Sequence, residues 1–257
     1  MLAACIAASM VVASTAARAE DRAAFVDVEA GAAVVGRHLA YQDDVAHQMN
    51  GYDLSAAPGV YGRAAFYPGA LLRGRVASMF GVTAEALYVA APDSLGVDGQ
   101  AVPVRAWTYG AGLRVRLPAS LPDVGLDVGY VAQRFTLGRS TPGLDAGVPN
   151  VGTQSLRIGA SARIAVTARV AFTARAAYLA VLSVGDAPRI YFPRLTTAAA
   201  DFAAGVAVAV AGGVELRFGA EYRRYFSDMH PAAGDARAVS GAVDQYVTGL
   251  LGVAWRR

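Results

Sequence analysis

The sequence contains no lysine and only one cysteine, Cys5. All 23 basic residues are therefore arginine, and against 20 acidic residues they leave a formal net charge of +3. A charge so close to balance, with no basic stripe interleaved with aromatic residues, argues against a nucleic-acid partner. A single cysteine excludes an intramolecular disulfide and a cysteine-based metal site. We expect no cofactor and no metal.

Long apolar runs are also absent. After residue 20, no stretch reaches the roughly 18 uncharged apolar residues that a membrane-spanning helix needs. Residues 202–214 come nearest, but this segment is too short and contains glycine. Nevertheless, 55% of the residues are hydrophobic and the mean hydropathy is +0.36, which is high for a soluble domain. The apolar residues must therefore follow another pattern.

The first 19 residues are apolar, rich in small residues, and end in an Ala-Arg-Ala cleavage pattern at residues 17–19. This pattern predicts a secretory signal peptide over residues 1–19 and one mature domain over residues 20–257. Cys5 follows a lipobox-like Leu-Ala-Ala, but no signal precedes it, so we interpret the segment as a cleaved signal peptide rather than a lipid anchor.

Apolar residues of the mature chain recur with a period of two. In residues 124–130 the even positions hold Val, Leu, Val and Tyr, and the odd positions include an Asp and a Gly. In residues 214–223 the even positions are apolar, and the odd positions read Glu, Arg, Gly, Glu, Arg. A helix would spread both sets around its circumference, so these segments are amphipathic strands.

Ten such segments follow one another: about 24–39, 57–67, 74–90, 103–117, 123–137, 153–165, 169–183, 200–210, 213–226 and 243–256. The connections alternate between short ones (68–73, 118–122, 166–168, 211–212) and long ones (40–56, 91–102, 138–152, 184–199, 227–242). This layout predicts an all-β, antiparallel up-and-down transmembrane barrel, with short periplasmic turns and longer extracellular loops. A soluble periplasmic β-barrel or β-sandwich binding protein stays open as the alternative.

One face of these strands collects charged residues, and in a membrane barrel that face lines the lumen. Because charges away from water must pair, and arginine suits several carboxylate contacts, we predict an ion-pair network across the lumen. Its predicted members are Asp27, Glu29, Arg37, Arg63, Arg75, Glu85, Arg114, Arg116, Asp127, Arg157, Arg163, Arg169, Arg175, Asp201, Glu215, Arg217, Glu221 and Arg223. The lumen is then either a plugged, structural interior or a narrow arginine-lined passive pore for small solutes.

Four of these arginines are spaced six residues apart, at positions 157, 163, 169 and 175. Six is a multiple of two, so all four keep one parity, whereas in a helix they would spread over three sides. We interpret the segment as a hairpin that turns at residues 166–168, with all four arginines pointing into the lumen.

Three arginines break the alternation and fall on the lipid face: Arg105, Arg134 and Arg224. With the short turns in the periplasm, all three lie near the outer ends of their strands, where they reach headgroups or lipopolysaccharide phosphates. Several aromatic residues share this outer rim, among them Trp107, Tyr109 and Tyr222. We therefore expect outer-membrane lipids and lipopolysaccharide as partners of these six residues.

The last strand, "DQYVTGLLGVAW", presents Val247, Leu251, Val253 and Trp255 to lipid. It resembles the C-terminal signal by which outer-membrane proteins are recognised for assembly, although two arginines follow the aromatic residue. The mature sequence as a whole resembles small bacterial outer-membrane β-barrel proteins, loosely similar in layout to the OmpA-type and omptin barrels. The resemblance implies residence in the outer membrane and assembly by the barrel-assembly machinery, but no single function.

The chain has no GxxxxGK[ST], HExxH, GxSxG or EF-hand pattern, so we expect no enzyme activity. One catalytic alternative comes from the ten-strand count, which the omptin proteases share. Those enzymes use an Asp pair and an Asp-x-His pair at the extracellular rim; the matching residues here are Asp43 with Asp44, and Asp228 with His230. The resemblance implies activation of a water by the His–Asp pair. The first pair departs from the family, whose two acids are separated by one residue.

Overall fold

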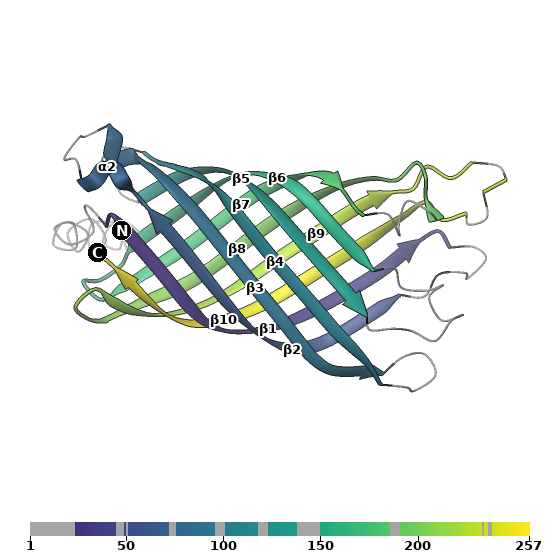
Figure 1. The fold of residues 1–257 in the computed structure, drawn as a ribbon, viewed down its shortest axis with the longest axis horizontal. Coiled ribbons are helices and arrows are strands. Elements are labelled where there is room, and N and C mark those ends of the chain that lie inside the picture. The colour runs from purple at the N-terminus through teal and green to yellow at the C-terminus, as the bar shows by residue number, and fades with distance from the viewer. Residues whose placement is uncertain are drawn as a thin grey trace, which may run out of the picture.

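The computed structural model describes residues 24–257 except 45–48, 50, 72–75, 96–100, 118–122, 138–149, 186–190, 233 and 236–237. The predicted signal peptide, with Cys5, and Arg75 lie outside the described residues. Ten antiparallel strands close into a barrel (Figure 1). They are β1 (Val26–Gln42), β2 (Tyr52–Phe66), β3 (Phe80–Leu95), β4 (Ala101–Arg116), β5 (Asp123–Leu137), β6 (Val151–Ala165), β7 (Val170–Ser183), β8 (Thr196–Ala211), β9 (Val214–Asp228) and β10 (Gly241–Arg256).

Each strand pairs with its neighbours in sequence, and β1 pairs with β10 to close the barrel. The start of β1, the end of β10 and the short connections lie at one end, which we call the termini end, and the long connections lie at the other, the loop end (Figure 1). Two short helices, α2 (Pro68–Leu71) and η2 (Ala77–Met79), join β2 to β3 at the termini end. The predicted fold class is confirmed.

The strand boundaries differ from the prediction in two ways. The third segment, predicted from residue 74, begins only at Phe80, because residues 77–79 form a helical turn. At the loop end the strands run further than their apolar patterns: β2 begins at Tyr52 rather than residue 57, and β8 at Thr196 rather than residue 200. Strand pairing therefore continues past the point where alternation of apolar and polar residues stops.

The hairpin turn between β6 and β7 spans residues 166–169, one residue more than predicted. The Thr167 hydroxyl accepts hydrogen bonds from the backbone N–H groups of Arg169 and Val170, at 3.2 and 3.0 Å. This side chain organises a turn that has neither glycine nor proline. Arg169 consequently lies in the turn and is exposed, so its predicted place in the lumen is wrong.

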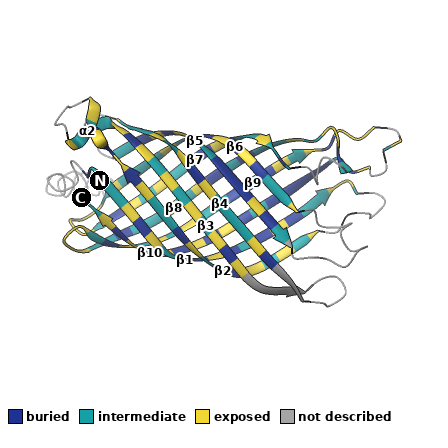
Figure 2. Ribbon diagram, viewed as in Figure 1, coloured by how far each residue is buried: buried dark blue, intermediate teal, exposed yellow. Residues whose placement is uncertain are grey.

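The barrel has its apolar residues outside and its charges inside. Exposed and less exposed residues alternate along the strands (Figure 2). The exposed set includes Val28, Val60, Leu113, Ile158, Phe172, Phe218 and Leu251. The buried set includes Glu29, Arg37, Asp127, Arg157, Asp201, Glu215, Arg223 and Asp244. This inverted distribution is that of a transmembrane barrel. The soluble barrel or sandwich, which would bury its apolar face, does not fit.

Among the described helices, none is long and apolar enough to cross a membrane.

Candidate functional site

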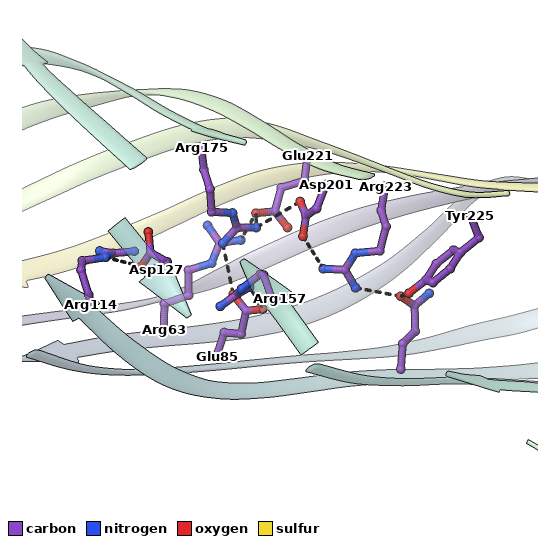
Figure 3. Close-up of polar contacts among 11 residues, drawn as sticks. Arg63, Glu85, Arg114, Asp127, Arg157, Arg175, Asp201, Glu221, Arg223 and Tyr225 are labelled. Atoms are coloured by element: carbon purple, nitrogen blue, oxygen red, sulfur yellow. Dashed lines mark hydrogen bonds and ion pairs between the residues drawn. The ribbon is translucent and has the colours of Figure 1, made fainter. Parts of the chain in front are cut away.

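The lumen is the candidate site, and a cluster of ion pairs occupies its centre (Figure 3). We call Arg63, Glu85, Arg157, Arg175, Asp201, Glu221 and Arg223 the central cluster. These residues come from six strands, β2, β3, β6, β7, β8 and β9, and reach one another across the lumen because small residues such as Gly159 and Ala203 share their face of the sheet.

Arg175 holds the central cluster together. Its guanidinium lies 3.2 Å from Glu85, 3.4 Å from Asp201 and 2.9 Å from Glu221. Glu85 also binds Arg157 at 2.5 Å. Asp201 also binds Arg223 at 2.8 Å. Glu221, the third shared carboxylate, also binds Arg63. Four arginines thus share three carboxylates, which leaves the central cluster with one positive charge in excess.

A second group of ion pairs lies toward the termini end. Arg217 contacts Asp27 at 2.9 Å, Glu29 at 3.0 Å and Glu215 at 2.7 Å. Glu215 also binds Arg163 at 2.6 Å. Two arginines therefore meet three carboxylates, so this group carries one negative charge in excess. Nearby, Arg114 binds Asp127 at 2.5 Å.

Arg116 differs from the other lumen arginines at this end. Its guanidinium stacks on the Tyr67 ring at 3.5 Å and donates to the backbone carbonyl of Ala24 at 3.0 Å. Within the part of the chain that the structure describes, no carboxylate forms an ion pair with it. A cation held by a ring and a carbonyl keeps its charge unneutralised.

The loop-end half of the lumen is tightly packed, with small cavities of about 60 and 50 Å³. Arg37 forms a two-pronged contact with Asp244, at 2.8 and 2.7 Å, and its side chain is 0% exposed. Rings of Phe135, Tyr246 and Tyr52 lie 4.1, 5.4 and 5.6 Å from the guanidinium. Buried apolar residues surround this layer: Val35, Ala57, Val89, Val104, Leu179 and Ala199. We call this ion pair and its apolar surroundings the loop-end plug.

A second apolar layer covers the plug at the barrel mouth. Two of its members, Leu39 and Ala242, belong to strands, and the other four come from the long connections: Met49, Phe192, Met229 and Val239. The loop end is therefore closed by side chains of both strands and loops.

A cavity of about 210 Å³ lies in the termini-end half, and we call it the termini-end chamber. Seven arginines and four carboxylates line it; the arginines are Arg63, Arg114, Arg116, Arg163, Arg175, Arg217 and Arg256, and the carboxylates are Asp27, Glu29, Asp123 and Glu221. The side chains of Arg63 and Arg114 are 29% and 27% exposed although they point into the lumen, so the chamber is hydrated.

The structure places all the predicted lumen residues inside the barrel except Arg169, in the turn, and Arg75, which is not described. The prediction missed several inward-facing partners: Asp244, Asp123, Arg256, Gln133 and Tyr61. Each lies on the inward parity of its strand, so alternation could have found them. Gln133 accepts from Arg223 at 2.8 Å, and Tyr61 donates to Glu29 at 2.5 Å.

The six predicted rim residues divide between two places on the outer face. Trp107 pairs across the sheet with Tyr88 on one side and Arg134 on the other, and its ring stacks on that of Tyr109 with centroids 5.0 Å apart. Arg105 follows on the same face of β4, and both arginines are exposed. We call these five residues the rim patch.

The other two predicted rim residues lie on β9. Tyr222 donates to Gln245 at 2.7 Å, and the Arg224 guanidinium lies 4.8 Å from the Phe226 ring.

The residues of the protease alternative are held in separate contacts at the loop end. Asp43 accepts a hydrogen bond from Ser240 at 2.6 Å, and Asp44 accepts one from the Met49 backbone at 2.7 Å. The His230 ring lies 3.3 Å from Asp228, and its other nitrogen lies 3.2 Å from the Thr196 hydroxyl. In the described residues, no cluster of three or more His, Cys, Asp or Glu side chains could hold a metal.

No protein-family model and no curated protein matches the chain. Similar solved structures include the translocator domain of autotransporter NalP from Neisseria meningitidis, with 12% identity and a TM-score of 0.41, covering 99% of this chain and 96% of that one. Ail, the attachment invasion locus protein of Yersinia pestis, has 9% identity and a TM-score of 0.32, over 91% of this chain and 99% of that one. OmpT, an outer membrane protein of Vibrio cholerae, has 10% identity and a TM-score of 0.27, over 91% and 100%. The fold assignment rests on the strand pairing, not on these likenesses.

Proposed function

We propose that the chain is a non-enzymatic protein of the bacterial outer membrane, whose barrel is closed by its own side chains and serves a structural role. In this arrangement the loop end faces the exterior and the termini end faces the periplasm. The apolar outer face supports insertion into lipid.

The loop-end plug is the observation that carries the proposal. A conducting pore needs a continuous hydrated path, and Arg37, Phe135 and Leu179 are buried across the lumen at this level. A buried ion pair cannot give way to passing ions without exposing its charges and its aromatic surroundings together. The plug therefore favours the structural interpretation over the pore.

Single-channel recording in planar bilayers tests this proposal. Refolded protein, with folding checked by heat-modifiable gel mobility, is expected to give no conductance steps, while a general porin treated alike gives them. Steps from the wild-type protein that change with Arg163→Ala or Arg217→Ala would instead establish an arginine-lined pore.

We also propose that the rim patch binds the phosphorylated headgroup of lipopolysaccharide. Two exposed guanidinium groups flank Trp107, a residue type that settles at the membrane interface, and guanidinium pairs well with phosphate. Arg105→Ala with Arg134→Ala removes two charge-assisted hydrogen bonds of about 1.5 kcal/mol or more each, so it is expected to weaken binding of lipopolysaccharide about a hundredfold or more. Arg169→Ala, an exposed arginine at the opposite end, is the control. Equal binding of dephosphorylated lipopolysaccharide would contradict the proposal.

We also propose that the barrel-assembly machinery recognises the last strand. Val247, Leu251, Val253 and Trp255 are all exposed on the outer face of β10, where a partner can read them. Trp255→Ala is expected to lower the yield of heat-modifiable barrel in the outer membrane of cells. An unchanged yield would show that Trp255 is not needed for recognition by the machinery.

A further inference from the structure

The termini-end chamber has features of a binding site that the proposed structural role does not require. It is closed toward the loop end by the central cluster and the plug, so it is a dead-end pocket rather than a section of a pore. Its volume of about 210 Å³ corresponds to roughly seven waters at about 30 Å³ each, which is more space than a phosphate-sized ion occupies.

The space in the chamber exists because one wall is made of small residues. Ala203 and Gly205 of β8 and Gly219 of β9 line it, and none has a side chain long enough to fill the lumen. The facing strands β2 and β4 contribute Arg63 and Arg114 instead. A ligand would therefore lie between a wall of small residues and a wall of guanidinium groups.

The charges favour an anion. Arginines outnumber carboxylates seven to four among the lining residues. The central cluster above the chamber carries one positive charge in excess, and the group around Arg217 carries one negative charge in excess, so these two cancel. The remaining positive charge comes from Arg116. Arg116 is neutralised by no carboxylate of the described residues, and its stacking on Tyr67 holds the guanidinium in place before any ligand arrives.

We propose that the termini-end chamber binds a small phosphorylated anion from the termini side of the barrel, with Arg63, Arg114 and Arg116 as its principal contacts. Planar guanidinium groups form paired charge-assisted hydrogen bonds with phosphate oxygens, and Arg116 can do so without giving up any carboxylate of the described residues. This proposal goes beyond the structural role and does not depend on whether the barrel conducts.

Titration calorimetry of the refolded wild-type barrel with inorganic pyrophosphate and inorganic phosphate, at constant ionic strength, tests it. We expect saturable binding of one ion per barrel. Arg116→Gln is expected to weaken binding about tenfold or more, the loss of one charge-assisted hydrogen bond. Arg169→Gln removes the same charge from the same end, outside the chamber, and is expected to leave the affinity unchanged.

Ala203→Leu provides a test that changes no charge. It narrows the chamber from the small wall, so we expect it to weaken binding strongly while heat-modifiable mobility shows an intact barrel. Two results would overturn the proposal: no saturable binding by the wild-type protein, or equal weakening by Arg116→Gln and Arg169→Gln, which would show only general attraction to a basic surface.

Discussion

The loop-end and termini-end halves of the lumen use the same residue type, arginine, under opposite conditions. Arg37 is 0% exposed and depends on one carboxylate, whereas Arg63 is 29% exposed and borders a hydrated chamber. A desolvated charge is tolerated only while its partner is in place, but a hydrated one can exchange a carboxylate for water. The dry half therefore provides rigidity, and the wet half has freedom to bind.

The strongest test of this difference removes the partner of the dry arginine. Asp244→Asn leaves Arg37 as an uncompensated buried charge, which is expected to lower the free energy of unfolding by about 3–5 kcal/mol. Urea unfolding of the barrel in lipid vesicles measures it. Replacing both residues, by Arg37→Met with Asp244→Leu, should restore most of that stability, because no charge is then buried. If Asp244→Asn is as stable as the wild type, the ion pair is not desolvated.

A cavity in the plug should be the next most harmful change. Leu179 is fully buried, so Leu179→Ala is expected to cost about 2–5 kcal/mol of unfolding free energy in the same assay. Leu182, in the same strand, is 62% exposed, and Leu182→Ala leaves no cavity, so it should cost clearly less. If the two variants lose equal stability, the loop-end half is not close-packed.

A carboxylate of the wet half should matter least. Glu29 is itself buried, but in Glu29→Gln the amide oxygen still accepts from Tyr61, and Arg217 keeps two carboxylates. No charge is left unpaired, so the expected loss is about 1–2 kcal/mol. The same urea titration gives the value. A loss as large as that of Asp244→Asn would remove the distinction between the two halves.

Much of the fold could be predicted from alternation alone, because a period of two determines which side chains share a face. The ten strands and most of the lumen arginines follow from it. Partner choice does not: Arg37 and Asp244 are separated by 207 positions in the chain, and their contact depends on the barrel's closure and on side-chain reach. Whether a position is odd or even in its strand predicts which face its side chain is on. It does not predict how far along the barrel axis the residue lies.

The loop-end plug shows the same limit. Val35, Val89 and Leu179 lie on the same inward face as the charged residues. The sequence shows that they are apolar, but it does not show that they gather at one height along the barrel axis. The turn at Arg169 was misplaced for a local reason. Thr167 supplies the turn through its hydroxyl, which leaves no glycine or proline as a signal.

The closing seam of the barrel has a consequence for how the chain folds. Pairing of β1 with β10 runs from Asp27 opposite Arg256 to Gln42 opposite Gly241, so the first strand must wait for the last one to be synthesised. Until then two open edges persist, and contacts of such sequence separation form slowly. A chain that lost its final strand would keep nine correct strands and still expose both edges to aggregation. The sixteen residues of β10 therefore decide whether the nine preceding strands close into a barrel.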